Sequence, residues 1–356
     1  MNIKDKVSRK IKNLTAYSSA DIACGIKLDA NENAFDMDGR LRKEFVSAAY
    51  ALRYNRYPGM SYTSLRAALA ELNGLSPENI IAANGSDELI GCIMQAFTDA
   101  DDSVIYFEPS FEMYRIIALA NKLNPVAVEL DGRFELDYKS FASAARRSGA
   151  KMVFLASPNN PTGNSFKKAA VMRIIREFPG LVVIDEAYSD FSGMSYLDAV
   201  KKHPNVIILK SFSKSYSMAG LRFGYLIAAR ETAEVINRVR LPYNLNVFTA
   251  LCAETALRHR KTFIKNIAVI RRERDRMAAA LKKIKGLKPY PSDANFILFS
   301  AGDRAAGIYK SLAEKGILIR YFNSGGALRG CLRVSVGKKN ENDRFLRTLK
   351  VLMKGL

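Results

Sequence analysis

Residues that build metal and redox sites are scarce in this 356-residue chain. Its two histidines lie in ordinary polar surroundings, and neither is assigned a role. The four cysteines, Cys24, Cys92, Cys252 and Cys331, stand far apart, without the paired spacing of zinc sites or redox motifs. We therefore expect no bound metal. Few, scattered cysteines also favour a reducing compartment, the cytoplasm.

Long apolar runs are missing as well. The stretch MNIKDKVSRKIKNL at the start is basic and lacks the apolar core of a secretory signal. No uninterrupted apolar run reaches the roughly 18 residues that a membrane-spanning helix needs. Internal repeats and low-complexity tracts are also absent. The sequence predicts a soluble protein, and a hydrophobic fraction of 48% suffices for a large domain and a smaller one.

The charge balance is strongly basic, with 55 Lys and Arg against 35 Asp and Glu and a formal net charge of +20. Such an excess can mark a nucleic-acid-binding protein. Much of it lies in the termini and in 257–288, where Phe263, Ile264, Ile270 and Met277 recur at helical spacing with charges between them. This pattern is typical of a core-packed helix with a solvated face, which is the interpretation we adopt. The charge would also attract anionic small molecules.

Short apolar runs alternate with helical patterns from about residue 76 to 230. Continuous apolar strands between helices predict an α/β domain whose mostly parallel sheet is covered on both faces. Beyond about residue 232 a long helix leads into a region that we predict to be a smaller α+β domain. The predicted strands are 80–83, 104–107, 126–130, 152–156, 181–184, 206–209 and 223–228, followed by 296–299, 317–319 and 332–336.

Ligands of such sheets gather at the carboxyl ends of the strands, so the residues that follow them are candidates for a site. Residues 84–88 open a helical pattern, which makes them either a plain N-cap or a phosphate site at a helix N-terminus. Asn160 lies in 157–163, which is otherwise an ordinary turn. Asp185 is either a loop or N-cap residue or a buried carboxylate that needs a cationic partner.

The strand at 206–209 is followed by Lys214, with Ser211 and Ser213 beside it and Arg222 eight residues on. The hydroxyls and the guanidinium suit a phosphate. Lys214 itself is either a further phosphate ligand or an amine that forms a Schiff base with the carbonyl of pyridoxal 5′-phosphate, PLP.

The other strand ends favour the second interpretation. PLP needs a carboxylate at its pyridine nitrogen, which Asp185 can supply. Asn160 and Tyr188 can hydrogen-bond its phenolic oxygen, O3′. The sequence thus favours a PLP enzyme in which Lys214 carries the cofactor.

Together the motifs resemble the fold-type I, PLP-dependent aminotransferases, and among them the histidinol-phosphate aminotransferases. They run in family order over nearly the whole chain. The resemblance implies a seven-stranded, mostly parallel sheet flanked by helices in the large domain. The matching stretches are LDANEN (28–33), RYP (56–58), NGSDE (84–88), SPNNPTG (157–163), DEAY (185–188), SFSK (211–214), AGLRFG (219–224) and LRVSVG (332–337).

The resemblance also implies roles at the cofactor. Lys214 would hold PLP and then act as general acid and base, while Asp185 would pair with the pyridine nitrogen and Asn160 and Tyr188 with O3′. Phe111 would pack against the cofactor, the alternative being a core aromatic residue. The cofactor phosphate would be held by the side chains of Ser211, Ser213 and Arg222 and by the backbone of Ser86 and Asp87.

The remaining implied contacts concern the partner subunit and the substrate. Tyr57 would reach the cofactor phosphate of a neighbouring subunit in a homodimer. Arg333, assisted by Arg320, would bind the substrate's anionic group, the alternative for both being solvated surface charge. Tyr17 is the expected N-terminal contact. The expected organisation is an arm at 1–27 associated with the small domain, a large domain at 28–250 and a small domain at 251–356.

The implied reaction is transamination between L-histidinol phosphate and 2-oxoglutarate, giving imidazole-acetol phosphate and glutamate, in L-histidine biosynthesis. Three departures touch the substrate side: residues 17–20 (YSSA) lack the family's Pro and Gly, Ala34 replaces a proline, and Gly59 replaces an aspartate. An aromatic or other amino-acid aminotransferase and a threonine-phosphate decarboxylase are therefore alternatives. The interpretation as a PLP-binding DNA regulator is supported by the charge alone. Such a regulator would carry a helix-turn-helix domain ahead of the aminotransferase motifs, which here begin by residue 28.

Overall fold

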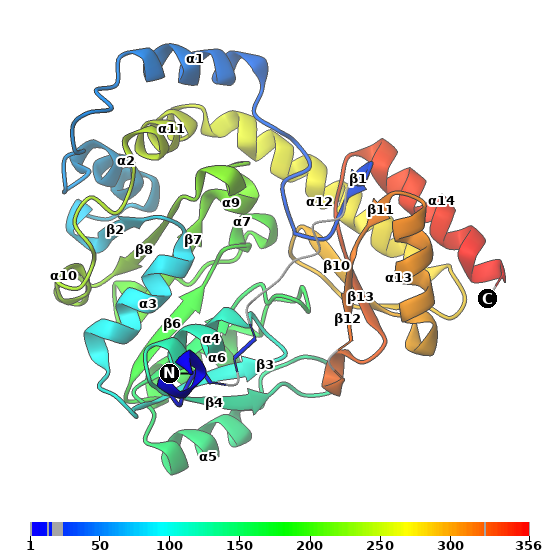
Figure 1. Ribbon diagram of the computed structural model, residues 1–356, viewed down its shortest axis with the longest axis horizontal. Helices are drawn as coiled ribbons and strands as arrows, with labels where there is room; N and C mark the ends of the chain where they lie inside the picture. Colours follow the sequence, from blue (N-terminus) through cyan, green and yellow to red (C-terminus); the bar gives the residue numbers. More distant parts are fainter. Residues whose placement is uncertain (1, 13, 16–23, 324, 356) are drawn as a thin grey trace.

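The computed structural model describes residues 2–12, 14–15, 24–323 and 325–355 (Figure 1). A seven-stranded sheet forms its centre, in the order β2-β8-β7-β6-β5-β3-β4. Neighbouring strands are parallel except β8, which is antiparallel to both of its neighbours. The predicted mostly parallel sheet is confirmed. Its strands are β2 (Ile80–Ala83), β3 (Ser103–Glu108), β4 (Asn124–Glu129), β5 (Met152–Ala156), β6 (Leu181–Asp185), β7 (Val206–Ser211) and β8 (Gly224–Ala228).

Helices cover both faces of this sheet, which explains the continuous apolar strands. Successive side chains of a strand point to opposite faces. Val153 and Leu155 therefore join one core cluster, whereas Phe154 joins the other. The first face is covered by α2 (Thr63–Asn73), α5 (Tyr138–Ser148), α6 (Lys168–Glu177), α8 (Leu197–Val200) and α11 (Val247–Arg258), and the second by α3 (Ser86–Phe97), α4 (Met113–Ala120) and α10 (Arg230–Asn237).

A second, antiparallel sheet lies beside the first, in the order β12-β13-β10-β9. Three helices flank it, and the longest, α12, buries Phe263, Ile270 and Met277 of the predicted helical pattern but leaves Ile264 exposed (Figure 1). Two further strands, β1 (Ile26–Lys27) and β11 (Ile317–Leu318), pair in parallel. The sheet and its helices comprise β9 (Lys288–Pro289), β10 (Phe296–Ser300), β12 (Arg320–Phe322), β13 (Cys331–Ser335), α12 (Arg260–Lys282), α13 (Ala305–Glu314) and α14 (Lys339–Gly355).

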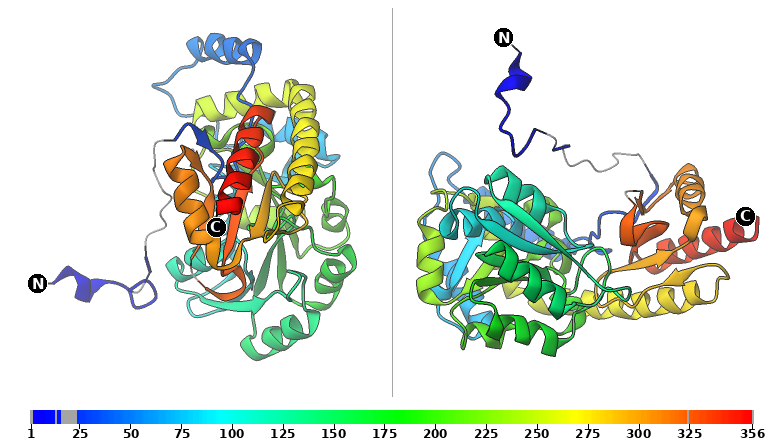
Figure 2. Two further views of the ribbon diagram at one scale, coloured as in Figure 1. Left: turned by 90° about the vertical axis from the view of Figure 1, so that its right-hand side faces the viewer. Right: turned by 90° about the horizontal axis from the view of Figure 1, so that it is seen from below.

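Two segments lie at the periphery. Helix α1 (Gly39–Tyr50) lies at the edge of the molecule beside α11, and the N-terminal segment stands away from the body (Figure 2). The Lys10 ammonium nevertheless contacts Asp101 at 2.8 Å and Asn124. Within the described ranges, no helix is long and apolar enough to cross a membrane. The remaining short elements are α7 (Ser189–Ser192), α9 (Phe212–Ser215) and single 3-10 turns at Ile3–Lys6, Pro77–Asn79, Ala219–Leu221, Gly302–Arg304 and Gly326–Leu328.

Candidate functional site

The predicted site residues come together at one edge of the large sheet. Asp185 ends β6, and Lys214 follows β7 in the short helix α9. Strand β2 runs in the same direction as β7, so Ser86, which opens α3, lies at this edge too. Arg222 precedes β8, whose antiparallel direction brings its amino end to the same place. The strand directions alone therefore assemble side chains that are far apart in the sequence.

The amine of Lys214 is half-buried. Its Nζ donates a hydrogen bond to the carbonyl of Ala30 at 3.2 Å and lies 6.0 Å from the ring centroid of Tyr188. Burial, reinforced by the positive charge of Arg333, lowers the pKa of Lys214 from 10.5 to about 8. About a tenth of the amine is then unprotonated at pH 7, far more than for an ordinary lysine, and the unprotonated amine is the state that can attack a carbonyl.

The carboxylate of Asp185 is buried at the end of β6. Its Oδ2 accepts a hydrogen bond from the Tyr114 hydroxyl at 2.8 Å, and its Oδ1 accepts one from the backbone N–H of Ala187 at 3.0 Å. Burial raises the pKa of Asp185 to about 6, although both hydrogen bonds oppose the shift. Such a carboxylate is stabilised by a nearby cation, such as a protonated ring nitrogen.

The segment 29–33 connects the two sheets across the site. Its Asn31 amide donates to the Tyr188 hydroxyl at 3.0 Å, and the amide of Asn33 donates to the Lys214 carbonyl at 2.7 Å. On the other side, Arg333 Nη2 donates to the Asp29 carbonyl at 2.6 Å. This segment therefore contacts the elements that carry the tyrosine, the lysine and the arginine.

Arg333 and Arg320 lie directly opposite each other on neighbouring antiparallel strands. Directly opposed side chains project from the same face of a sheet. Arg333 is buried and also donates through Nη1 to the side-chain oxygen of Asn160. Arg320 is half-buried, and its guanidinium has no hydrogen bond or ion pair to any other described residue. Two guanidinium groups on the same face of a sheet form a favourable place for an anion.

Arg222 forms the wall of a small polar cup. Its Nη2 pairs with the Asp87 carboxylate at 2.9 Å, and its Nη1 donates to Ser213 Oγ at 3.3 Å. The Ser211 hydroxyl accepts from the backbone N–H of Ser213 at 3.2 Å and caps α9. The buried Ser86 opens α3, so the first backbone amides of that helix have no partner within it. This arrangement suits a phosphate.

Two glycines keep this cup open. Gly85 has a φ of 84°, and a Cβ there would lie 2.7 Å from Arg222 Nη2. A Cβ on Gly224 would lie 2.5 Å from the backbone nitrogen of Ser86. Side chains at these positions would therefore fill the space between Arg222 and the start of α3 or push the backbone apart.

Three predicted residues lie differently. Phe111 is half-buried and meets the Tyr114 ring edge-on, at 5.6 Å between centroids. Tyr57 is 79% exposed and stacks on Tyr243 at 4.3 Å. In the described part of the chain, no hydrogen bond or ring contact joins Tyr57 to the cup. Tyr17 lies outside the described residues.

Tyr114 and an ion pair behind the site were not among the residues predicted from the sequence. The Glu186 side chain is fully buried and pairs with Lys210 at 2.6 Å. Burial alone would lower the pKa of Lys210, but the negative charges of Glu186 and Asp190 and the hydrogen bond to Glu186 together outweigh burial and raise it. Both members adjoin predicted site residues, Asp185 and Ser211, and that adjacency was the available signal. Tyr114 lies inside a helical pattern and gave no such signal.

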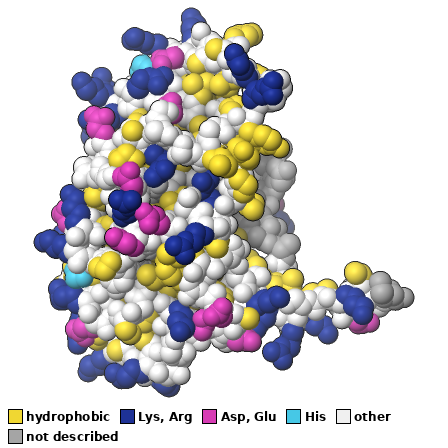
Figure 3. Space-filling view, turned by 90° about the vertical axis from the view of Figure 1, so that its left-hand side faces the viewer, with side chains coloured by type: hydrophobic (Ala, Val, Ile, Leu, Met, Phe, Trp, Pro, Cys, Tyr) yellow, Lys and Arg dark blue, Asp and Glu magenta, His cyan; other side chains and the backbone are white. Residues whose placement is uncertain are grey.

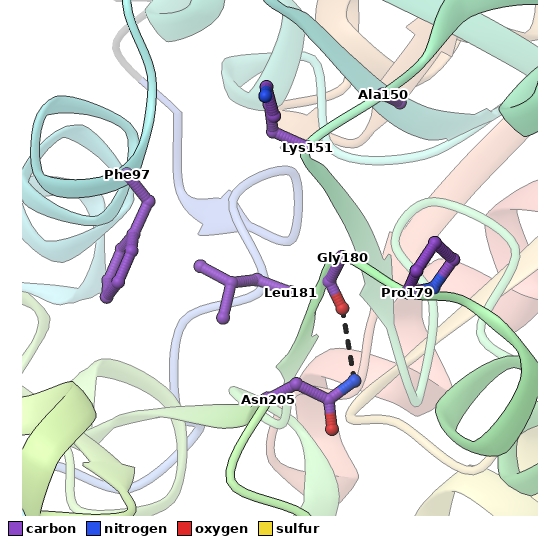
Figure 4. Close-up of a pocket in the computed structure, with 7 residues that line it drawn as sticks. All are labelled: Phe97, Ala150, Lys151, Pro179, Gly180, Leu181 and Asn205. Carbon is purple, nitrogen blue, oxygen red and sulfur yellow. Dashed lines mark hydrogen bonds between the residues drawn. The ribbon is translucent and has the colours of Figure 1, made fainter.

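A surface hollow lies at the opposite edge of the sheet, where β5 and β6 begin (Figure 4). Its lining includes one charged side chain, Lys151, and an amide, Asn205, that donates to the Gly180 carbonyl at 3.0 Å. The convergent charged groups described above lie at the carboxyl ends of the strands instead. We therefore place the candidate site there, as expected for an α/β sheet.

Comparison with known proteins identifies the family. Residues 24–349 match the family described as aminotransferase class I and II. The chain belongs to this family. Relatives of this aminotransferase include the histidinol-phosphate aminotransferase of Caldanaerobacter subterraneus subsp. tengcongensis, 35% identical over 353 residues and covering 99% of both chains. That of Roseiflexus castenholzii is 40% identical over 331 residues, covering 91% of this chain and 89% of the relative.

A solved structure agrees with this assignment. The histidinol-phosphate aminotransferase of Sinorhizobium meliloti in complex with PLP superposes with a TM-score of 0.88 at 25% identity, covering 98% of each chain. The predicted family and the predicted fold-type I architecture are confirmed.

Proposed function

We propose that this aminotransferase binds PLP through Lys214 and exchanges amino groups between L-histidinol phosphate and 2-oxoglutarate, in L-histidine biosynthesis. The observation that carries the proposal is the convergence of the Lys214 amine, the Asp185 carboxylate and the Arg222 cup at one edge of the sheet. The names of relatives that cover nearly the whole chain support the substrate.

The residues fit the cofactor. When bound, PLP withdraws electrons from the substrate's Cα–H bond and makes that proton acidic. The buried Asp185 would keep a proton on the pyridine nitrogen, because an anion in that position stabilises a cation. Tyr188 and Asn160 would orient O3′, and Phe111 would cover the ring. The lowered pKa of Lys214 lets its amine accept the Cα proton and return it to another carbon.

The Arg222 cup would hold the cofactor phosphate. Arg222, Ser211 and Ser213 supply side-chain donors, and the first amides of α3, at Ser86 and Asp87, supply backbone donors. The Arg222 guanidinium has five N–H donors, so it can keep the Asp87 carboxylate while it binds a phosphate oxygen.

The opposed arginines would bind the second anionic group of each substrate. Histidinol phosphate presents a phosphate there and 2-oxoglutarate a carboxylate, and a guanidinium binds both through paired hydrogen bonds. Arg320 is available for this role because its guanidinium has no acidic partner among the described residues. Arg333 would be held in place by the Asp29 carbonyl and Asn160. Tyr17 remains part of the proposal as the N-terminal contact.

The assembly that we propose is a homodimer in which Tyr57 reaches the partner's cofactor phosphate. Exposed apolar and aromatic side chains gather near it in α1, in the segment after α1 and in 241–243, as expected of an interface. The exposed side chains are Val46, Tyr50, Tyr54, Tyr57, Met60, Leu241 and Tyr243.

The basic charge gives little support to a nucleic-acid partner. On the face shown in Figure 3, Lys and Arg side chains are scattered, and acidic side chains lie among them. A DNA-binding surface needs its positive charge gathered in a patch or stripe. The proposed location is the cytoplasm, whose reducing conditions suit four cysteines that form no disulfide in the described chain.

A substrate panel tests the proposed reaction. Purified holoenzyme is given histidinol phosphate, phenylalanine or threonine phosphate, and glutamate formation from 2-oxoglutarate and carbon dioxide release are measured. We expect histidinol phosphate to give the highest kcat/KM. A higher value for phenylalanine would replace the proposal with an aromatic aminotransferase, and carbon dioxide release from threonine phosphate would replace it with the decarboxylase.

A further inference from the structure

We propose that Tyr114 is a positioning residue that fixes the Asp185 carboxylate for the cofactor's pyridine nitrogen, an inference that rests on the proposed function. Tyr114 belongs to α4, on the face of the sheet opposite to α5 and α6. Its hydroxyl donates to Asp185 Oδ2 at 2.8 Å. The other carboxylate oxygen, Oδ1, is held by a backbone donor, the N–H of Ala187.

The surroundings of Tyr114 explain why its hydroxyl is well placed. The side chain is 1% exposed, so water does not compete for its hydrogen bond. Its ring stacks on Phe154 of β5 at 5.3 Å and meets Phe111 edge-on at 5.6 Å. These apolar contacts hold the ring from two sides and leave Asp185 as the partner of the hydroxyl. Tyr114 therefore contacts both the proposed pyridine partner and the proposed ring-covering residue.

The charges near Asp185 show why a donor matters there. Besides burial, the carboxylates of Asp87 and Glu186 raise the pKa of Asp185, whereas the Tyr114 hydroxyl and the Ala187 N–H lower it. The Glu186 carboxylate is in turn paired with Lys210. Tyr114 thus opposes the tendency of a buried, negatively surrounded carboxyl to take up a proton. A protonated Asp185 would no longer hold a proton on the pyridine nitrogen.

The substitution Tyr114→Phe removes one hydroxyl and keeps the ring contacts. PLP dissociation constants of apo-protein are measured from pH 5 to 8 by absorbance, with thermal unfolding as the check of the fold. We expect about tenfold weaker binding at neutral pH, since hydrogen bonds to charged groups contribute on that scale. PLP affinity should fall at low pH, and we expect the midpoint of this fall to move to a higher pH in the variant. The reason is that the hydrogen bond from Tyr114, which lowers the pKa of Asp185, is lost.

Tyr106→Phe is the matched control. Tyr106 is another buried tyrosine that donates to a carboxylate, Glu108 Oε1 at 2.8 Å, but it does not contact Asp185. We expect PLP affinity and its pH dependence to match those of the wild type. A loss as large as that of Tyr114→Phe would show that any buried tyrosine hydroxyl matters equally and would overturn the inference.

A second variant covers the case in which Tyr114→Phe does not fold. Replacing Tyr114 with 3-fluorotyrosine keeps the shape of the side chain and makes its hydroxyl a stronger donor. The pH midpoint of PLP binding should then move downward. An unchanged pH midpoint in the 3-fluorotyrosine variant, or an unchanged PLP affinity in Tyr114→Phe, overturns the inference. The proposed function fails separately, if the wild-type protein itself binds no PLP.

Discussion

Lys210 and Lys214 are four residues apart, and their surroundings change their acidity in opposite directions. Burial lowers the pKa of Lys214 to about 8, and the neighbouring Arg333 charge adds to the effect. Lys210 is also withdrawn from solvent, but its pairing with Glu186 raises its pKa. Lys210 therefore stays charged as a structural cation, while Lys214 can act as a neutral amine.

The rate of PLP capture tests this difference. In apo-protein the rate of cofactor attachment should rise with pH, with a midpoint at about 8, because only the neutral Lys214 amine attacks the carbonyl. Stopped-flow absorbance measures this rate. Lys214→Ala and Lys214→Arg should show no attachment while remaining folded. A midpoint near the ordinary lysine value of 10.5 would contradict the account.

Asp185 makes the stability of apo-protein depend on pH. Its pKa in the folded state is raised from 3.8 to about 6, so between these values the folded state binds more protons than the unfolded state. The stability that this protonation contributes is therefore present at low pH and is lost as pH rises through about 6. The buried negative charge costs about 3 kcal/mol at pH 7.

The substitution Asp185→Asn tests this effect. Removing the charge should raise the free energy of unfolding of apo-protein at pH 7 by about 2–3 kcal/mol. This gap between variant and wild type should be smaller by about 1 kcal/mol at pH 5. Urea unfolding at the two pH values measures the gap. PLP affinity should fall in the same variant, because the pyridine nitrogen loses its partner. A gap that does not change with pH would assign the effect to packing.

At the scale of elements, the backbone conformation at the start of α3 leads to a testable prediction. Ala at position 85 would be strained at a φ of 84° and would also place its Cβ 2.7 Å from Arg222 Nη2. Gly149 provides the matched control, because its φ is 59° and a Cβ there would meet no atom within 4 Å. Gly149→Ala should cost about 1 kcal/mol of stability, because its backbone is left-handed helical. Gly85→Ala should cost about 1–3 kcal/mol, because its φ of 84° and ψ of 161° lie in a region that essentially only glycine adopts. Only Gly85→Ala should also weaken PLP binding, which cofactor absorbance measures. Equal PLP affinities of the two variants would contradict the proposal that the Arg222 cup binds the cofactor phosphate.

The strand pair β12 and β13 carries the prediction about substrate. Arg320→Gln should raise KM for both histidinol phosphate and 2-oxoglutarate about tenfold or more, since one charge-assisted interaction is lost. PLP affinity should stay unchanged. The control is Arg329→Gln, because Arg329 is an exposed arginine in the same part of the chain. Steady-state kinetics measure the KM values. An unchanged KM for both substrates would show that Arg320 does not bind the anionic group of the substrates.

The sequence predicted the large sheet well because its strands are continuous apolar runs. The run 152–156 coincides with β5, and 80–83 coincides with β2. An apolar run does not encode strand direction, so the antiparallel β8 could not be foreseen, although its direction brings Arg222 to the site. Helical spacing likewise overestimated the core at Ile264, which is 57% exposed.

Candidate site residues at strand ends could be predicted for the same reason, since polar side chains after apolar runs are conspicuous. Tyr114 could not, because an aromatic residue within a helical pattern is more often a core residue than a ligand of a carboxylate. The contacts of segment 29–33 also depend on how the two sheets lie together, which no local pattern specifies.

At the scale of the whole molecule, the division into a large domain at 28–250 and a small domain at 251–356, with the arm at 1–27 beside the small domain, stays a proposal. Arg320 and Arg333 belong to the smaller sheet, whereas Lys214 follows a strand of the larger one. Segment 29–33 contacts both Lys214 and Arg333. Any movement between the sheets would therefore change the distance between the substrate's anion site and the reacting amine.

Complementation between subunits tests the proposed homodimer. Tyr57→Ala and Lys214→Ala chains are each expected to be impaired as homodimers. Mixed dimers made by co-expression with two affinity tags should contain one complete site, formed by Lys214 of one chain and Tyr57 of the other. Activity should rise above that of either homodimer. No rise in purified mixed dimers would place Tyr57 in its own subunit's site or outside any site.

The most direct test of the central claim is the location of the cofactor bond. Holoenzyme is treated with borohydride, which reduces and fixes the lysine–cofactor linkage, and then digested and analysed by tandem mass spectrometry. The account predicts one pyridoxyl-phosphate group per chain, on Lys214. A stoichiometric label on any other lysine, including Lys210, or no label on a protein that carries out transamination, would contradict it.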